Sequence, residues 1–295
     1  MANCLVSFGA NLGHAAATIR AAYATLQQQL SATSSELSRL FKTPPVGGPS
    51  GQPPFVNAVA AFNTLASPWE VWKIIRGIEH DFGRERNVRW EARKLDVDIL
   101  LYADQKIWTP QLKIPHPRMC MRRFILAPAV DCAADYVDPV SGLTIAQLHQ
   151  RVRSQPGSLC VYTRRPQDDL VLLEEAARVT GAQISVQEQS ALSGTNRSVH
   201  LHDLNKGLGA AVQNLAVFVE HQPMREGAAW EDLYRPLAAQ LGLCDSSAPA
   251  NQRTANWNLS GPRYLLVSED RQWITHELIA ALEAMDCPVE PLSDT

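Results

Sequence analysis

The order of the apolar segments in the first hundred residues limits the folds open to this 295-residue chain. Short β-branched runs that predict strands alternate with stretches whose apolar residues recur every three or four positions, as on the buried face of a helix. A Gly/Pro-rich segment at 44–54 cannot form regular structure and separates two of the strands. The predicted strands lie at 5–9, about 37–43, 55–64 and 95–101, and the predicted helices at about 14–30 and from 68 to about 83.

This β-α-β-β-α-β order favours an α+β domain with a ferredoxin-like antiparallel sheet and helices on one face. The rest of the chain alternates in another way, with helices expected at 168–180, 230–241 and 273–285, and favours a smaller α/β domain. The last segment, 264–292, is expected to form a closing β-α-β unit of that domain. A linker-like stretch at 154–158 separates the two, so we expect domains at 1–158 and 165–295.

Two acidic residues, Asp96 and Asp98, lie in the predicted strand at 95–101. Side chains of a strand alternate, so both carboxylates should share one face, and Leu95, Val97, Ile99 and Leu101 the other. Two neighbouring carboxylates repel each other unless a cation lies between them. Basic residues are bunched nearby, at 73, 76, 84, 86, 89, 93 and 94. This pattern favours a divalent metal and a polyphosphate, and the ordinary alternative is a solvated strand face beside a charged helix end.

Bulk properties exclude several classes of protein. The net charge of -3 argues against non-specific nucleic-acid binding, which needs a strongly basic face. The six cysteines show no C-x-x-C spacing and predict reduced thiols in a cytoplasmic protein. The N-terminus lacks the pattern of a signal peptide, and no stretch is apolar enough to span a membrane. We therefore expect small-molecule substrates, no nucleic acid and no membrane, and the pattern leaves the oligomeric state open.

Six sequence blocks occur in one order and at regular spacing through the first half. They are GANLG at 9–13, KTPP at 42–45, FVNA at 55–58, IE at 78–79, RKLDVDIL at 93–100, and IPHPRM at 114–119 followed by RRF at 122–124. With these blocks, about residues 3–150 resemble the 6-hydroxymethyl-7,8-dihydropterin pyrophosphokinase (HPPK) family. A lone D-x-D would be weak evidence, but six collinear blocks are strong.

The resemblance implies a transferase that moves pyrophosphate from ATP to the pterin hydroxymethyl oxygen and leaves AMP, in folate biosynthesis. It implies that Asp96 and Asp98 hold two Mg²⁺ ions, and that Arg84 and Arg93 lie near the transferred group. Arginine suits this task because its forked guanidinium grips phosphate oxygens in pairs. The other ATP-binding positions implied are Glu79, Arg86, Arg89, Trp90, Ile99, His116 and Arg122.

The resemblance also implies a pterin pocket. A flat, donor-rich pterin suits a slot between two aromatic rings with an amide at its edge. Phe55 and Phe124 match the stacking positions, Asn57 matches the amide, and the segment lining the pocket matches Thr43, Pro44 and Val46. The loops at 47–54 and 84–92 match mobile loops whose closure excludes water. Core packing for the phenylalanines, a strand-edge role for Asn57 and a structural role for His116 are the alternatives.

The chain departs from the family pattern just before the acidic pair. Glu91-Ala92 stands where the family has Gly-Pro, and Lys94 where it has a small or hydroxyl residue. Losing Gly-Pro changes the stiffness of a loop. The alternative function is therefore a degenerate pterin- or nucleotide-binding protein with weak or no turnover.

The second half carries weaker signals. His200 and His202 share one strand face and suggest a metal site, although no third ligand follows at a recognisable spacing. Gly207-Leu208-Gly209 lacks the third glycine of a dinucleotide loop. No motif of an aldolase or synthase supports a fusion of two folate enzymes, so an interaction or oligomerisation domain is the default for 165–295.

Overall fold

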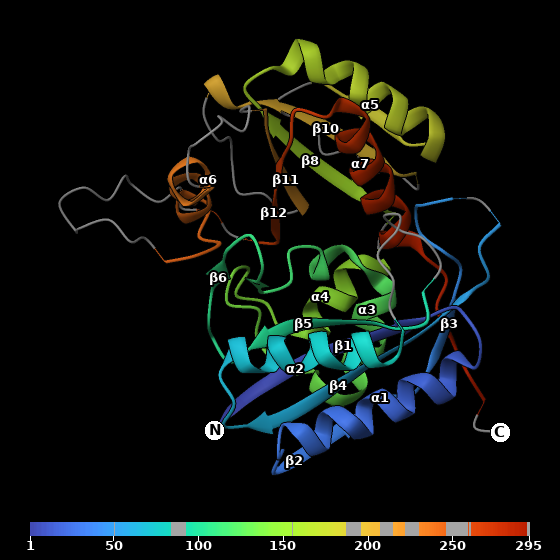
Figure 1. Cartoon of the computed structure of the whole chain (residues 1–295). Helices are drawn as coiled ribbons and strands as arrows, with labels where there is room; N and C mark the ends of the chain where they lie inside the picture. The colour runs from blue at the N-terminus through green and yellow to red at the C-terminus, as the bar shows by residue number, and fades with distance from the viewer. Residues whose placement is uncertain are drawn as a thin grey trace.

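The computed structural model describes residues 1–49, 51–83, 93–154, 156–186, 196–206, 215–221, 230–245, 259 and 261–293, with the side chains of 230–234 excepted. Figure 1 shows two large β-sheets with helices packed between and around them, and a small third sheet pairs β6 (Ile107–Trp108) with β7 (Lys113–Ile114). The N-terminus and β13, which precedes the last described residues, lie at the sheet at the bottom of the view (Figure 1).

The first sheet is antiparallel and follows the strand order β13-β3-β4-β1-β5, with β2 paired to β4. Helices α1 and α2 pack on one face, which confirms the ferredoxin-like α+β fold, while α3 covers the other face together with α4. The elements are β1 (Ala2–Ala10), α1 (Ala15–Gln29), β2 (Ser34–Leu37), β3 (Phe41–Thr43), β4 (Phe55–Thr64), α2 (Pro68–Asp81), β5 (Asp96–Tyr102), α3 (Arg123–Ala133) and α4 (Ile145–Ser154). The single strand expected at about 37–43 is two strands.

Local sequence signals fix the ends of α2. Ser67 Oγ accepts a hydrogen bond from the Glu70 N–H (3.3 Å), and the Ser67 N–H donates to Glu70 Oε2 (2.7 Å). This capping box satisfies two backbone donors that the first turn leaves open, and Pro68 at the first helical position needs no such partner. Gly83 follows the helix with a φ of +73°, a conformation that costs glycine little.

A β-bulge interrupts the pairing of β5 with β1. Val6 pairs with Ile99 but Leu5 pairs with Leu101, so Leu100 is the extra residue. Leu101 consequently packs on the face opposite to Ile99, and the alternation expected for this residue is wrong. The bulge follows the two aspartates, so their shared orientation is unaffected.

The second sheet is parallel, with the order β12-β11-β8-β10-β9. Helices α5 and α7 pack together on one face and α6 on the other (Figure 1), which confirms an α/β arrangement. The elements are β8 (Ser158–Thr163), α5 (Pro166–Thr180), β9 (Gln183–Ser185), β10 (Ser198–Asp203), β11 (Leu215–Glu220), α6 (Trp230–Gln240), β12 (Arg263–Val267) and α7 (Arg271–Asp286).

The last strand belongs to the first sheet. β13 (Glu290–Pro291) pairs antiparallel with β3, and the Leu292 N–H donates to the Leu40 carbonyl (2.8 Å). The closing β-α-β unit expected at 264–292 is therefore wrong in its last strand. A two-residue strand carries almost no sequence signal of its partner, because its pairing depends on where α7 delivers the chain.

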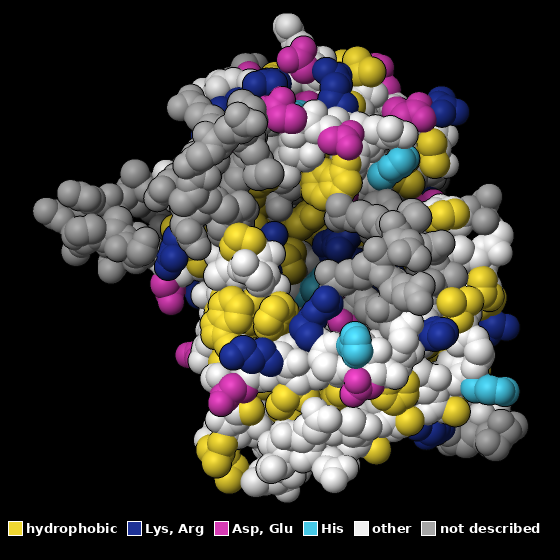
Figure 2. Space-filling model, in the orientation of Figure 1, with side chains coloured by type: hydrophobic (Ala, Val, Ile, Leu, Met, Phe, Trp, Pro, Cys, Tyr) yellow, Lys and Arg dark blue, Asp and Glu magenta, His cyan; other side chains and the backbone are white. Residues whose placement is uncertain are grey.

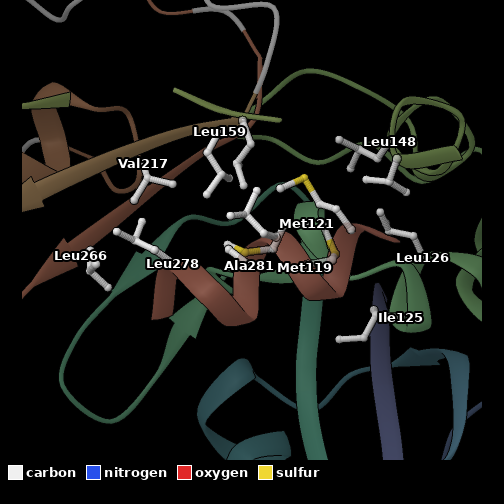
Figure 3. Close-up of a cluster of buried hydrophobic side chains, with 14 of the residues drawn as sticks. Met119, Met121, Ile125, Leu126, Leu148, Leu159, Val217, Leu266, Leu278 and Ala281 are labelled. Carbon is white, nitrogen blue, oxygen red and sulfur yellow. The ribbon is translucent and has the colours of Figure 1, made fainter. Parts of the chain in front are cut away.

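One apolar cluster joins the parts built on the two sheets. Figure 3 shows Met119 and Met121 of the 3₁₀ turn η1 (Met119–Met121) beside Leu278 and Ala281 of α7, with Leu159 and Val217 of the second sheet close by. The cluster continues into α3, α4 and the first sheet. In the part of the chain that the structure describes, no helix is long and apolar enough to cross a membrane.

Candidate active site

Asp96 and Asp98 lie at the start of β5, on the edge of the first sheet. Pairing with β1 sets Asp96 opposite Gly9 and Asp98 opposite Ser7. Both side chains are partly exposed, whereas Val97 between them is buried among the side chains beneath α1 and α2. The strand therefore holds both carboxylates on one face, as the alternation of the sequence predicts.

Arg93 contacts the first of these carboxylates directly. Its Nη1 atom lies 2.5 Å from Asp96 Oδ2. The backbone around Arg93 is also fixed, since its N–H donates to Asn11 Oδ1 (2.6 Å) and its carbonyl accepts from the Asn11 N–H (3.0 Å). One predicted phosphate-binding arginine thus stands beside a predicted metal ligand.

His116 approaches the second carboxylate. Its backbone N–H donates to the carbonyl of Leu100 at the bulge (2.8 Å), and its Nδ1 accepts from the Arg118 N–H (3.2 Å). Nδ1 acts as the acceptor, so the neutral ring carries its proton on Nε2, which lies 3.7 Å from Asp98 Oδ2. Burial, together with the charges of Arg122 and Arg118, holds the pKa of His116 well below its ordinary value. The ring is therefore neutral at neutral pH.

Arg118 and Arg122 flank this histidine and are both partly buried. Burial and the neighbouring Arg118 lower the pKa of Arg122 to about 10. Burial acts to lower the pKa of Arg118, but the charges of Glu277, Tyr264, Asp98 and Asp96 together outweigh it, and the pKa is raised. At neutral pH both guanidiniums stay charged, which leaves concentrated positive charge near the carboxylate pair.

The predicted pterin residues lie at the other end of the same face. Asn57 is buried, and its Nδ2 donates to Thr43 Oγ1 (2.8 Å), which fixes the orientation of the amide. The guanidinium of Arg122 lies 5.5 Å from the centre of the Phe124 ring. Phe55 is partly buried at the start of β4, and Pro44 and Val46 follow β3 in the Gly/Pro-rich loop.

Two of the predicted ATP-binding residues, Glu79 and Ile99, are placed differently from His116 and Arg122. Glu79 is buried on α2, where Oε1 accepts from the Val97 N–H (3.0 Å) and Oε2 from Arg76 Nη1 (2.9 Å). It therefore holds the strand segment between the two aspartates. The Ile99 side chain packs in the core beneath α1 and α2, so a contact from this residue to a ligand would use its backbone.

Asn11 is a site residue that the predicted set misses. Besides its two bonds to Arg93, its Nδ2 donates to the Pro53 carbonyl (3.2 Å). One side chain thus ties the end of the arginine loop to the end of the Gly/Pro-rich loop. Its place in the GANLG block was the available signal, since asparagine in a turn commonly bonds to nearby backbone.

Some predicted residues lie outside the described part of the chain. These are Arg84, Arg86, Arg89 and Trp90, together with the departing residues Glu91 and Ala92 and the glycine pair at 207 and 209. The candidate histidines of the second half are described. His202 stacks on Tyr162 with a centroid distance of 4.6 Å. Among the described residues, no group of three or more His, Cys, Asp or Glu side chains could hold a metal ion.

Helix α7, which packs on the second sheet, contacts the site at two points. Arg118 Nη1 lies 3.2 Å from both carboxylate oxygens of Glu277, and the Gly47 N–H donates to Glu283 Oε2 (3.2 Å). Figure 2 shows a hollow on this face of the molecule, between the parts built on the two sheets, where basic and histidine side chains gather. Neither glutamate was predicted, because the sequence of the second half contains no recognised motif.

Comparison with known proteins places the similarity in the first half. A family model described as 7,8-dihydro-6-hydroxymethylpterin-pyrophosphokinase (HPPK) matches residues 5–134. A protein of Bacillus subtilis named 2-amino-4-hydroxy-6-hydroxymethyldihydropteridine pyrophosphokinase is 38% identical over 126 residues, which cover 43% of this chain and 75% of that protein. The Pseudomonas aeruginosa protein of the same name is 38% identical over 130 residues, with 44% and 80% covered.

Two longer proteins are also similar. The mitochondrial folate synthesis bifunctional protein of Arabidopsis thaliana is 31% identical over 175 residues, which cover 59% of this chain and 31% of that protein. A solved structure of Plasmodium falciparum HPPK-DHPS with pteroate aligns with a TM-score of 0.42 and 13% identity. That alignment covers 82% of this chain and 60% of the other, so the chain spans about three fifths of its length.

Proposed function

Because this chain belongs to the family of 7,8-dihydro-6-hydroxymethylpterin-pyrophosphokinases, we propose that it transfers pyrophosphate from ATP to 6-hydroxymethyl-7,8-dihydropterin. The observation that carries this proposal is the position of the Asp96/Asp98 pair. The pair lies on the face of the first sheet that His116 approaches. Gly9 of β1 pairs with Asp96 of β5 on one side and with Asn57 of β4 on the other, so the pair lies next to the fixed amide of Asn57. A polyphosphate end and a pterin end are thereby adjacent.

The carboxylate pair fits Mg²⁺. Asp96 and Asp98 supply hard oxygen donors on a rigid strand, and both are partly exposed to an incoming ligand. Mg²⁺ commonly takes one or two protein carboxylates and completes its shell with waters and substrate phosphates, so a larger protein cage is not needed. When bound, the two ions would offset the phosphate charge and polarise the reacting phosphorus–oxygen bonds.

The transfer is a displacement at the β-phosphorus of ATP. The pterin hydroxymethyl oxygen forms a bond to that phosphorus, and the bond from the phosphorus to the α,β-bridging oxygen breaks. AMP leaves, and the hydroxyl proton passes to solvent. Such a reaction needs alignment and charge compensation more than covalent help. Arg122 and the Nε2–H of His116 would donate to ATP, and Arg93, with Arg84 by resemblance, would donate to the transferred group.

The pterin would lie against Phe55 and Phe124 with its edge read by Asn57. The bond from Asn57 Nδ2 to Thr43 Oγ1 leaves the side-chain oxygen Oδ1 of Asn57 to accept from the donor edge of the pterin. Thr43, Pro44 and Val46 would line the pocket, and closure of the loops would keep water from the reactive phosphorus.

AMP formation tests this function. Wild-type protein with ATP and Mg²⁺ should form AMP only when the pterin is present. Asp96→Ala and Asp98→Ala should each lower kcat by at least about 100-fold, because each removes a metal ligand at the transferred charge. Asp104→Ala, an exposed residue just beyond β5, is the matched control and should retain activity. Formation of AMP without pterin, or full activity of both aspartate variants, would refute the proposal.

Calorimetry separates the enzyme from the alternative of a degenerate binding protein. An enzyme should bind the pterin and release AMP, whereas a degenerate relative should bind the pterin without forming product. The observation behind the alternative is the sequence departure at Glu91-Ala92 and Lys94.

A further inference from the structure

Glu277 is a buried carboxylate that the proposed reaction does not use. It lies on α7, in the half of the chain outside the matched family region, and its side chain is 1% exposed. Both of its oxygens lie 3.2 Å from Arg118 Nη1, and the Tyr264 hydroxyl donates to Oε2 (3.4 Å). Burying a carboxylate is costly unless it is paired, so the role of Glu277 depends on the group with which it pairs.

Arg118 is that group, and it stands beside the candidate metal ligands. Its backbone N–H donates to Nδ1 of His116, whose Nε2 lies 3.7 Å from Asp98 Oδ2, and the charges of Asp98 and Asp96 act on its guanidinium. A guanidinium released from Glu277 in this partly buried position would turn to Asp98, since a partly desolvated charge favours an opposite charge nearby. It would then occupy oxygens that a cation needs.

The geometry points to Glu277 as a positioning residue of the active site. We propose, on the basis of the proposed function, that Glu277 holds Arg118 away from Asp98 and so keeps this carboxylate open to Mg²⁺ and its bound polyphosphate, whereas Asp96 is paired with Arg93. The part of the chain built on the second sheet thereby completes the site of the first. The ligand bound there would be a divalent metal ion in complex with a nucleoside triphosphate.

The framework around Glu277 is rigid enough for this task. Leu278, Ala281 and Leu282 of the same helix are buried in the cluster that joins the two sheets (Figure 3). One and a half turns further on, Glu283 accepts from the Gly47 N–H of the Gly/Pro-rich loop. Helix α7 is therefore fixed to both ends of the site, and the position of Glu277 is set by packing rather than by its own flexibility.

Metal binding tests this role without requiring turnover. The probe is Mn²⁺, followed by electron paramagnetic resonance in the presence of a non-hydrolysable ATP analogue. Glu277→Gln keeps the size of the side chain and removes its charge, so Arg118 is freed and Mn²⁺ should bind about tenfold more weakly. Pterin affinity should stay unchanged. Glu175→Gln, which breaks an exposed ion pair with Arg178 on α5, is the matched control and should bind Mn²⁺ like the wild type.

A double variant separates positioning from simple stabilisation. In Arg118→Met/Glu277→Gln the freed guanidinium no longer exists, so Mn²⁺ affinity should return to within about twofold of the wild type. Arg118→Met alone separates the two roles: a merely structural role makes it as harmful as Glu277→Gln, because it also leaves one buried charge unpaired, whereas positioning predicts Mn²⁺ binding close to that of the wild type. If Glu277→Gln alone fails to fold, the double variant, which leaves no unpaired buried charge, still tests the role, because a Mn²⁺ affinity more than about twofold below that of the wild type would contradict it.

Three results would overturn the inference. They are unchanged Mn²⁺ affinity in Glu277→Gln, no recovery in the double variant, and an absence of Mn²⁺ binding in the wild type. The last would also remove the metal from the proposed function, whereas the first two would leave it intact. A wild type that shows the expected Mn²⁺ pattern but forms no AMP would refute the proposed function and leave the role of Glu277 standing.

Discussion

Gly9 lies between the two ends of the site, opposite Asn57 on one neighbouring strand and Asp96 on the other. A Cβ atom at this position would stand 3.2 Å from Asn57 Oδ1. Asn57 cannot easily withdraw, because Thr43 Oγ1 holds its amide nitrogen at 2.8 Å. Gly9→Ala should therefore displace the amide that we propose reads the pterin, and weaken pterin binding about tenfold, at a cost in stability of about 1 kcal/mol. Fluorescence titration and urea unfolding measure the two effects.

Gly77→Ala is the matched control for this substitution. Gly77 is exposed on α2, and a Cβ there would meet no atom within 4 Å. Alanine in a helix interior should raise the free energy of unfolding by about 0.5–1 kcal/mol and leave pterin affinity unchanged. Equal pterin affinity in the Gly9 and Gly77 variants would contradict the role given to Gly9.

The Cys4 thiol links stability to alkaline pH. Burial in β1 raises its pKa to about 12 from 9.0. The unfolded chain loses this proton near pH 9 while the folded chain keeps it, so the thiol's contribution to stability is full below that pH and falls as the pH rises. The loss in free energy of unfolding caused by Cys4→Ala should consequently be smaller at about pH 10 than at pH 8, by about 1.4 kcal/mol. Denaturation in a reductant at both pH values measures it, and a constant cost would contradict the expected burial of the thiol.

The positions of the chemical groups were predictable where one strand or one motif fixes them. Alternation alone places Asp96 and Asp98 on one face, and the collinear blocks single out Asn57 and His116. Glu79 illustrates what a motif leaves open, because its bond to the Val97 N–H depends on how α2 packs against β5. The same limit applies to Glu277, whose partner lies 159 positions away in the sequence.

At the scale of elements, β13 covers the outer edge of the first sheet. It pairs with β3, the strand that ends at the proposed pterin residue Thr43 and leads into the Gly/Pro-rich loop. An unpaired strand edge exposes backbone groups, so this short strand protects β3 and limits its movement. The element belongs in sequence to the second half but in structure to the first.

Leu292 tests the contribution of this strand. Leu292→Pro removes the N–H that donates to the Leu40 carbonyl, whereas Leu292→Ala keeps it and loses only packing. The proline variant should be less stable than the alanine variant by about 1 kcal/mol, the net value of one backbone hydrogen bond. It should also bind pterin more weakly, as measured by calorimetry. Equal stability and affinity of the two variants would show that β13 does not hold β3.

Most helices and strands follow from local patterns, and the exceptions have non-local causes. The capping box predicts the start of α2, and Gly181, with a φ of +71°, marks the end of α5 as expected. The bulge at Leu100 and the partner of β13 were not predictable, because register and pairing depend on residues far away in the sequence. Periodicity identifies an element but not the neighbour against which it packs.

For the whole molecule, the main question is whether the parts built on the two sheets unfold separately. Domains joined only by a linker usually have separate cores. Here one apolar cluster includes Leu5 and Val59 of the first sheet, Met121 of the 3₁₀ turn, and Leu159 and Leu278 of the second part. Because β13 also returns to the first sheet, we expect the two parts to unfold together.

Leu278→Ala, a substitution in the part built on the second sheet, tests whether the two parts unfold together. Leu278 is fully buried on α7, so its truncation should cost about 2–5 kcal/mol. With a single cooperative transition, the loss should appear equally in a probe of the first sheet and in a probe of the second. Hydrogen exchange of β1 and β4 amides and of β8 and β11 amides provides these probes. Val171→Ala, an exposed residue of α5, is the control and should change neither.

A fragment ending at residue 157 gives the complementary measurement. It would expose the faces of η1, α3 and α4 that now pack against α7, and it would remove Glu277 from Arg118. We expect this fragment to be less stable than the full chain and to bind Mn²⁺ with the ATP analogue more weakly, because both the buried surface and the positioning contact are lost. A fragment with wild-type stability and full pyrophosphokinase activity would show that the second part is dispensable. If the fragment instead folds but binds the metal poorly, and Arg118→Met restores that binding, the defect lies in the free guanidinium rather than in the lost core.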